Sequence, residues 1–213
     1  MNAVISFLEV KVCALCFIAL PVIYIISFAS HPNLFNLKPV RKAEVWAAEF
    51  RHNKKLHFLH LLILGSTLLI INIALYLMKM LECQYEIFAL IGGSLGIIGA
   101  VALAADKGAL CLVPSAFDTL DDKQFQQLLP GLETLLYRKG YTCVLGLLIL
   151  LPIGFIILAV GLILAKAIFI WQGVTLIIGM MFMINPDIDL FSLIGSCFML
   201  ISLGSIGISL LFA

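Results

Sequence analysis

Long apolar runs constrain this chain more than any other feature of its sequence. Such runs fall at residues 12–30, 57–78, 87–105, 141–165, 167–184 and 190–212. A helix that crosses a bilayer needs about 20 apolar residues, because each residue rises about 1.5 Å across a hydrocarbon core about 30 Å thick. The sequence therefore predicts an all-α polytopic integral membrane bundle with about six transmembrane helices, in a single transmembrane domain over 1–213.

The composition agrees with this fold class and excludes some functions. Hydrophobic residues make up 63% of the 213 residues and charged residues 12%. Soluble domains carry about 25% charged residues. A net charge of +1 leaves no basic field that would recruit nucleic acid. We expect the lipid bilayer to be the main partner, with a membrane-protein partner or a homo-oligomer as alternatives.

The sequence gives no support for an enzyme. It has no HExxH, no P-loop and no glycine-rich dinucleotide fingerprint. Its four histidines all lie between positions 31 and 60, so haem ligation between facing helices lacks a second ligand, and we expect these histidines to lie at the membrane interface. No catalytic residue, cofactor or metal is predicted, and the enzyme question stays open with a leaning towards no.

Two connecting segments have sequences typical of segments that lie at a membrane surface. The segment 115–139 places apolar residues at three- and four-residue spacing, which predicts an amphipathic helix in the interface, interrupted at Pro130. The segment between the first two runs is basic and holds Lys38, Arg41, Lys42, Arg51, Lys54 and Lys55. Short interfacial helices are therefore part of the predicted fold.

The distribution of lysine and arginine predicts the orientation. Loops after the first, third and fifth runs hold ten of the thirteen basic residues, whereas the opposite side holds Lys11, Lys79 and Lys166. Cytoplasmic loops of membrane proteins carry the excess of positive charge. Both termini are therefore expected outside.

A ladder of small residues marks the third run. Gly92, Gly96, Ala100, Ala104 and Gly108 recur at intervals of four and form a smooth face that lets a neighbouring backbone approach closely. Packing within the bundle is the simplest interpretation, and homodimerisation or room for a ligand are alternatives. We expect the serine- and glycine-rich run 190–212 to pack against this helix or, alternatively, to line a polar path.

Asp106 and Lys107 follow the last turns of that ladder. If the helix continues to about residue 113, both charges lie below the headgroups, where a charged side chain costs about 2.5–3.5 kcal/mol and normally has a partner inside the bundle. If the helix ends near Ala105, the pair marks the interface, where lysine can extend towards water. The second interpretation is the simpler one.

A second acidic feature lies in the turn INPDIDLF, which holds Asp187 and Asp189. Helix parity puts this turn on the same side of the membrane as Asp106 and Lys107. We therefore predict a polar cluster of Asp106, Lys107, Asp187 and Asp189, in which Lys107 pairs with Asp187 or Asp189. Two carboxylates without further ligands are weak grounds for a divalent metal, and none is assigned.

Three stretches carry a resemblance to a known group of proteins. ALAADKGALCLVPSAFDTL, LPIGFIILAVGLILAKA and INPDIDLF resemble small bacterial six-span membrane proteins grouped as domains of unknown function. The resemblance covers most of the chain from the second run onward. It implies a six-helix bundle in the bacterial cytoplasmic membrane, and it brings no activity or site residues.

Two functions follow as hypotheses. The first is a non-enzymatic membrane interaction or accessory protein, whose basic segment 38–55 and amphipathic segment 115–139 contact anionic lipid or a partner protein. The alternative is a small transporter or channel for a small polar solute or ion, using Asp106 and Lys107. The alternative requires a polar path through the middle of the bundle.

Overall fold

The computed structural model describes residues 2–37, 43–81, 85–109, 116–136, 143, 146–184 and 188–212. All regular secondary structure in these ranges is helical. The main helices are α1 (Asn2–Ala29), α2 (Ala43–Phe50), α3 (Lys54–Met80), α4 (Glu86–Lys107), α6 (Asp122–Leu136), α8 (Leu150–Leu164), α9 (Ile170–Phe182), α10 (Asp189–Met199) and α11 (Ser205–Phe212). The 3-10 turn η2 (Phe117–Thr119) precedes α6, and the π-helical turn η3 (Leu200–Gly204) joins α10 to α11 in one helix.

Five of the described helical segments are long and apolar enough to cross a membrane. They are Leu8–Ala29, Lys54–Met80, Glu86–Lys107, Gly146–Leu164 and Asp189–Phe212. The expected run 167–184 instead forms α9, which has 13 residues and is therefore about 20 Å long at 1.5 Å per residue. Turns and bends take up the rest of that run.

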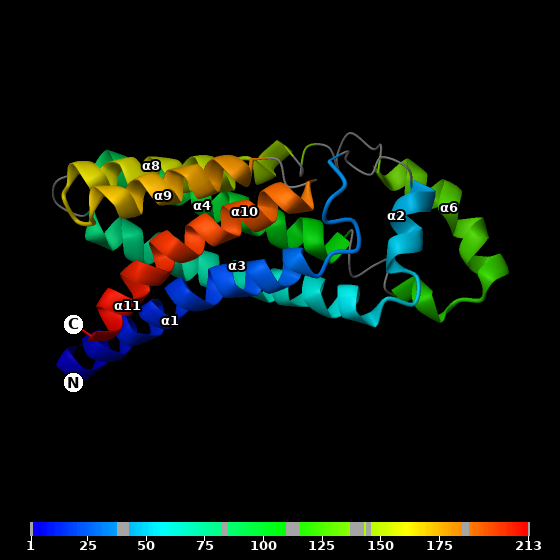
Figure 1. The fold of residues 1–213 in the computed structure, drawn as a ribbon, viewed down its shortest axis with the longest axis horizontal. Coiled ribbons are helices and arrows are strands. Elements are labelled where there is room, and N and C mark those ends of the chain that lie inside the picture. The colour runs from blue at the N-terminus through cyan, green and yellow to red at the C-terminus, as the bar shows by residue number, and fades with distance from the viewer. Residues whose placement is uncertain are drawn as a thin grey trace.

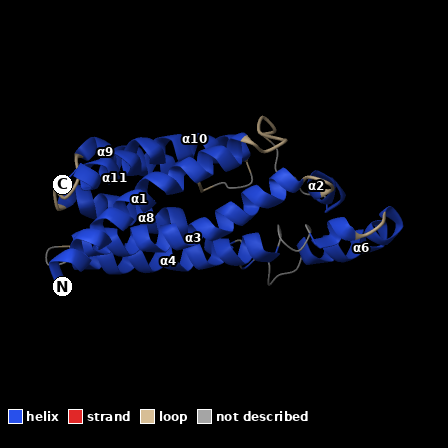
Figure 2. Ribbon diagram, turned by 90° about the horizontal axis from the view of Figure 1, so that it is seen from below, coloured by secondary structure: helices blue, strands red, loops and turns tan. Residues whose placement is uncertain are grey.

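The long helices pack in chain order around a closed ring (Figure 1). α1 contacts α3, α3 contacts α4, α4 contacts α8, α8 contacts α9, and α9 contacts α10. The final helix, α10–η3–α11, returns to α1 and closes the ring. Both chain termini lie at one end, called here the terminal end, and α2 and α6 lie at the opposite end, called the head end (Figures 1 and 2).

The long helices are apolar on both their inner and their outer faces. In α3, Ile70 and Leu77 are buried in the bundle, whereas Leu68 and Leu75 are at least half exposed on its outside. A helix of a soluble protein would carry polar residues on the outer face. The largest fully buried side chains of the bundle, including Phe17, Ile70, Phe155 and Leu158, are apolar.

The final helix has neighbours that the sequence did not predict. It packs mainly against α1 and α9, rather than against α4 as expected, because the ring order separates it from α4. Its π-helical turn brings the Ser202 hydroxyl to the Gln172 carbonyl at 2.6 Å, and the Gln172 amide donates to the Ser205 hydroxyl at 2.9 Å. Gln172, Ser202 and Ser205, in the terminal half of the bundle, thus satisfy their polar groups by hydrogen bonds to one another.

The helices α2 and α6 with η2 form a small unit, called here the head, which lies crosswise beyond the end of the bundle (Figure 1). Ala47 of α2 packs against Phe125 and Leu132 of α6. The apolar face that predicted an interfacial helix is therefore largely covered by α2. The expected interruption at Pro130 is wrong, since α6 continues through that residue and loses only the hydrogen bond that proline cannot donate.

Candidate functional site

The small-residue face of α4 forms the seam with α8. A Cβ atom built on Gly154 of α8 would lie 2.3 Å from the Gly96 nitrogen and 2.5 Å from the Gly92 carbonyl oxygen. Ala100 is fully buried. Ala104 is half-buried, and at Gly108 a Cβ atom would meet nothing within 4 Å. The close approach of α4 and α8 thus lies in the part of the ladder from Gly92 to Ala100.

The seam also contains the pattern GxSxG, at Gly92–Gly96. In hydrolases this pattern places a nucleophilic serine on a sharp turn between a strand and a helix. Here all five residues lie inside α4. The match therefore carries no catalytic assignment.

Asp106 lies inside the protein and is only 5% exposed. α4 ends at Lys107, within two residues of the expected end near Ala105, and residues 110–115 lie outside the described part of the chain. The Asp106 carboxylate lies 3.1 Å from the Lys107 ammonium group. A buried carboxylate needs such a partner, because an isolated charge in an apolar interior is costly.

Asp189 has a partner that the sequence analysis did not consider. Its carboxylate lies 3.1 Å from Nδ1 of His31, and both side chains are mostly buried, at 18% and 14% exposure. Asp187 lies outside the described residues. Asp106 thus pairs with Lys107 within α4, and Asp189 of α10 pairs with His31.

His31 connects the bundle to the head. Glu49 of α2 lies close enough to His31 and Asp189 to interact with both electrostatically, and it accepts a hydrogen bond from the Asn33 side chain. Burial raises the pKa of Glu49, His31 opposes this rise, and Asp189 adds to it. The His31 imidazole thus lies near two carboxylates, those of Asp189 in α10 and Glu49 in α2.

Aromatic rings complete this junction. The His31 ring meets the His60 ring edge-on at 5.2 Å between centroids, and Phe50 of α2 contacts both His60 and His57. His60 is buried, and its Nδ1 lies 2.9 Å from the Leu56 carbonyl oxygen. His60 is thus enclosed by the protein, and the expectation that the histidines lie at the level of the membrane interface stays a prediction.

Sequence reasoning missed the His31–Asp189 pair because 158 positions separate the two residues along the chain, as counted from their numbers. One signal was present. Both residues flank long apolar runs at ends that share a side of the membrane by parity. Only the closure of the ring, which sets α1 beside α10, brings these two ends together.

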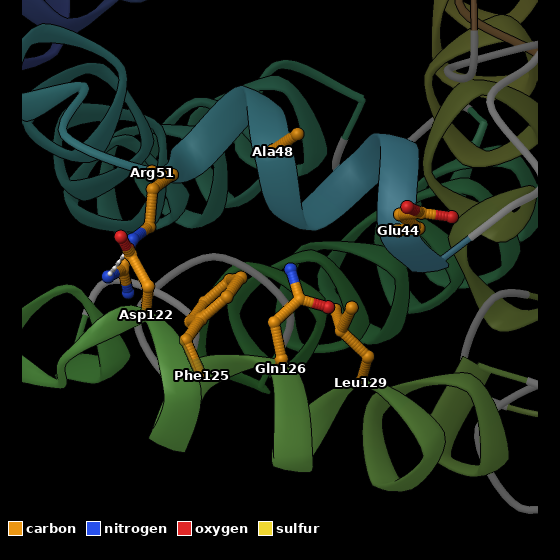
Figure 3. Close-up of a pocket in the computed structure, with 7 residues that line it drawn as sticks. All are labelled: Glu44, Ala48, Arg51, Asp122, Phe125, Gln126 and Leu129. Carbon is orange, nitrogen blue, oxygen red and sulfur yellow. Dashed lines mark hydrogen bonds and ion pairs between the residues drawn. The ribbon is translucent and has the colours of Figure 1, made fainter.

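A groove of about 600 Å³ lies between α2 and α6 in the head (Figure 3). Among its lining residues, Arg51 is the single cation, and its guanidinium is already occupied. It donates to the Leu120 carbonyl at 2.9 Å and to Asp122 at 2.9 Å, and it lies 4.3 Å from the centre of the Phe125 ring. Arg51 therefore holds η2 and α6 against α2 and does not offer an anion-binding group.

The described part of the chain contains no cluster of side chains that could bind a metal ion. Among those residues, no group of three or more histidine, cysteine, aspartate or glutamate side chains is arranged to hold a metal ion.

Comparison with protein-family models, with curated proteins and with solved structures finds no match. The resemblance to bacterial six-span proteins stays a prediction.

Proposed function

We propose that the protein is a non-enzymatic integral membrane protein with six membrane-crossing segments, whose head end contacts anionic lipid at the cytoplasmic face. The observation that carries this proposal is the apolar outer face of the long helices. Leu61, Leu68 and Leu75 recur every seven residues along α3 and are all exposed. Only lipid or another apolar surface would cover such a stripe without a free-energy cost.

The arrangement of the ends supports six crossings. An odd number of crossings would place the two termini on opposite sides, whereas both lie at the terminal end (Figure 1). α9 is short, but it packs along α8 and α10, and its flanking residues Phe169 and Ile184 are apolar and exposed. A locally thinned bilayer accommodates a short helix at a modest cost.

The charges at the head end support contact with anionic lipid. Lys54 and Lys55 are exposed at the first turn of α3, where the bundle meets the head. A lysine near an anionic membrane surface contributes about 1 kcal/mol of binding free energy. The expected excess of positive charge on this side also favours a cytoplasmic head.

Reconstitution of the full chain tests the lipid contact. In nanodiscs, adding phosphatidylglycerol to phosphatidylcholine is expected to raise the apparent Tm, and high salt is expected to remove the increase because it screens exposed charges. The double variant Lys54→Glu/Lys55→Glu should lose this increase. Lys166→Glu, which changes an exposed lysine at the terminal end, is the matched control and should keep it.

Two results would count against the proposal. Complete release of the protein from membranes by alkaline carbonate would exclude membrane integration. An equal Tm in both lipid mixtures, in a protein that is otherwise folded, would exclude the anionic lipid contact and leave a partner protein as the occupant of the head surface.

A transporter is not proposed. Asp106 and Asp189 are buried ionisable residues of the kind that mark transport paths. However, the largest buried side chains of the bundle are apolar, and the buried hydroxyls of Ser66, Ser196 and Ser202 bond to backbone carbonyls. Impermeant thiol reagents can test the orientation in a cysteine-free background, where Lys166→Cys should react from outside the cell and Lys54→Cys should not.

A further inference from the structure

The outer face of α3 carries a single narrow stripe of exposed side chains, called here the α3 stripe. Its residues are separated by three and four positions in strict alternation, the spacing at which two helices pack along each other as a left-handed pair. They are Phe58, Leu61, Gly65, Leu68, Asn72 and Leu75. The stripe is about 26 Å long at 1.5 Å per residue, which is most of the thickness of a hydrocarbon core. Lipid alone would cover its leucines, so the spacing does not by itself identify a partner.

Asn72 distinguishes the stripe from a face that only lipid covers. It lies six residues inside the end of the apolar run 57–78, and therefore about 9 Å from that end. Its side chain is exposed on the outside of the bundle, and its amide has no hydrogen-bond partner within the described part of the chain. Hydrocarbon supplies neither donors nor acceptors, so an amide at this depth is costly unless another protein group pairs with it.

Gly65 leaves room for a second helix, seven residues from Asn72 on the same face. A Cβ atom built on Gly65 would meet nothing within 4 Å, so the packing of the chain itself does not require a glycine there. In membranes, small residues on a helix surface let a second backbone approach closely. The stripe therefore combines a polar group that lacks a partner with a place where a neighbouring helix fits.

We propose that the α3 stripe is the interface of a parallel homodimer, in which the Asn72 amides of the two copies hydrogen-bond to each other. An amide both donates and accepts, so a twofold axis that sets position 72 opposite itself satisfies both copies. Copies inserted in the same orientation have parallel α3 helices, and a buried asparagine at one position of such a pair fixes its register. An unrelated partner would need a polar group at the same depth, which a second copy supplies by symmetry.

The charged end of the stripe does not oppose this pairing. Lys79 lies four positions beyond Leu75, and a parallel dimer brings two such lysines to the terminal end. Within each copy, however, the Lys79 ammonium group lies 2.9 Å from a carboxylate oxygen of Glu9. Both side chains are about half exposed, so solvent and salt also screen the repulsion between the two copies.

Dilution of the full-length protein in phosphatidylcholine vesicles tests the dimer. Energy transfer between copies labelled at the N-terminus with a donor or an acceptor should fall with the protein-to-lipid ratio as a monomer–dimer equilibrium requires. Asn72→Leu should weaken dimerisation about 3- to 20-fold, the range that hydrogen bonds between membrane helices supply. Asn72→Gln keeps an amide and is the matched control, with a smaller loss. Equal dimerisation of Asn72→Leu and the parent protein would overturn the proposal.

Folding of the variants is separable from their pairing, because both positions face away from the bundle. At high lipid dilution, Asn72→Leu and Gly65→Leu should leave the apparent Tm unchanged or raise it, since leucine suits a helix surface covered by lipid. Gly65→Leu should nevertheless reduce energy transfer, because its side chain fills the room for the second backbone. A Gly65→Leu protein that pairs as tightly as the parent would contradict this interface.

Cross-linking locates the interface. In a cysteine-free background, Leu75→Cys should give disulfide-linked dimers on mild oxidation, because this position faces its copy in a parallel pair. Val174→Cys is the matched control, since it is also exposed and near the terminal end but lies on α9, three places from α3 in the ring. Equal cross-linking at both positions would mean random collision of the copies and would overturn the proposal.

The dimer rests on the proposed insertion in a membrane but not on what the head binds. Release by alkaline carbonate would contradict both proposals. A membrane-integrated monomer whose Tm still responds to phosphatidylglycerol would contradict only the dimer. A dimer without that response would contradict only the anionic lipid contact.

Discussion

Asp189, the first residue of α10, holds its carboxylate 3.1 Å from Nδ1 of His31, two positions beyond the end of α1. α1 and the continuous helix formed by α10, η3 and α11 are also joined nearer the terminal end. There the Lys11 ammonium group donates to the carbonyl oxygens of Leu210 and Leu211, at 3.2 and 2.7 Å. The seam that closes the ring is therefore fastened by a polar contact at each end.

The ion pair gives a first prediction. Asp189→Leu should lower the free energy of unfolding by about 1–3 kcal/mol, because it leaves a mostly buried imidazole without its partner. Asp189→Asn should cost less, since its side-chain oxygen can still accept a hydrogen bond from Nδ1. Thermal unfolding in detergent measures both variants, and equal Tm values for the two would contradict the role given to this contact.

Glu49 predicts a pH dependence with a defined sign. Its pKa is raised above the ordinary value of 4.5, mainly by burial, so the folded protein retains a proton that the unfolded chain has already lost. Stability must therefore fall as the pH rises from 4.5 through the raised pKa. Glu49→Gln should be more stable than the parent protein at neutral pH, and this advantage should disappear below about pH 4.5. An advantage that is independent of pH would contradict the assignment.

The α4–α8 seam gives a steric prediction. Gly154→Ala would place a methyl group 2.3 Å from the Gly96 nitrogen, which requires the helices to separate and should cost about 1–3 kcal/mol. Gly146→Ala lies on the same membrane-spanning segment, where a methyl group meets nothing within 4 Å. We expect that control to be neutral or slightly stabilising. A neutral result for Gly154→Ala would show that the seam is looser than described.

Arg51 gives a prediction for the head. Arg51→Lys should increase hydrogen exchange of the α6 amides, because an ammonium group cannot reproduce the planar contacts with the Leu120 carbonyl and the Phe125 ring. Asp122→Ala removes only a partner that is 96% exposed, and it should change the exchange little. If the two variants behave alike, the ion pair rather than the carbonyl contacts orders the head.

The helices were predictable from sequence because their signal is local. A long apolar run can satisfy its backbone hydrogen bonds in lipid only as a helix, whatever its neighbours are. The run 167–184 was the exception in length, since α9 ends at Phe182 and begins at Ile170. Hydropathy reports that a segment is apolar and does not report where its turns begin.

The contacts between helices were not predictable, because they depend on which faces meet. The apolar residues of α6 fit an interfacial helix and a helix packed on α2 equally well. The structure shows that Phe125 packs against Ala47, and a position of α6 at a membrane interface stays a prediction. Likewise, Asp106 is buried because it lies on the face of α4 that packs into the bundle, which hydropathy does not report. The partner of Asp189 follows from the order of the helices in the ring.

The closed ring also sets an order of events during synthesis. Chains emerge from the ribosome N-terminal part first, so α1 enters the membrane long before α10 and α11 exist to cover it. Until α10 and α11 have been made, the face of α1 that packs against them, including Lys11, lacks these neighbours. The ring therefore closes only when residues 188–212 have been made and have returned to the first helix.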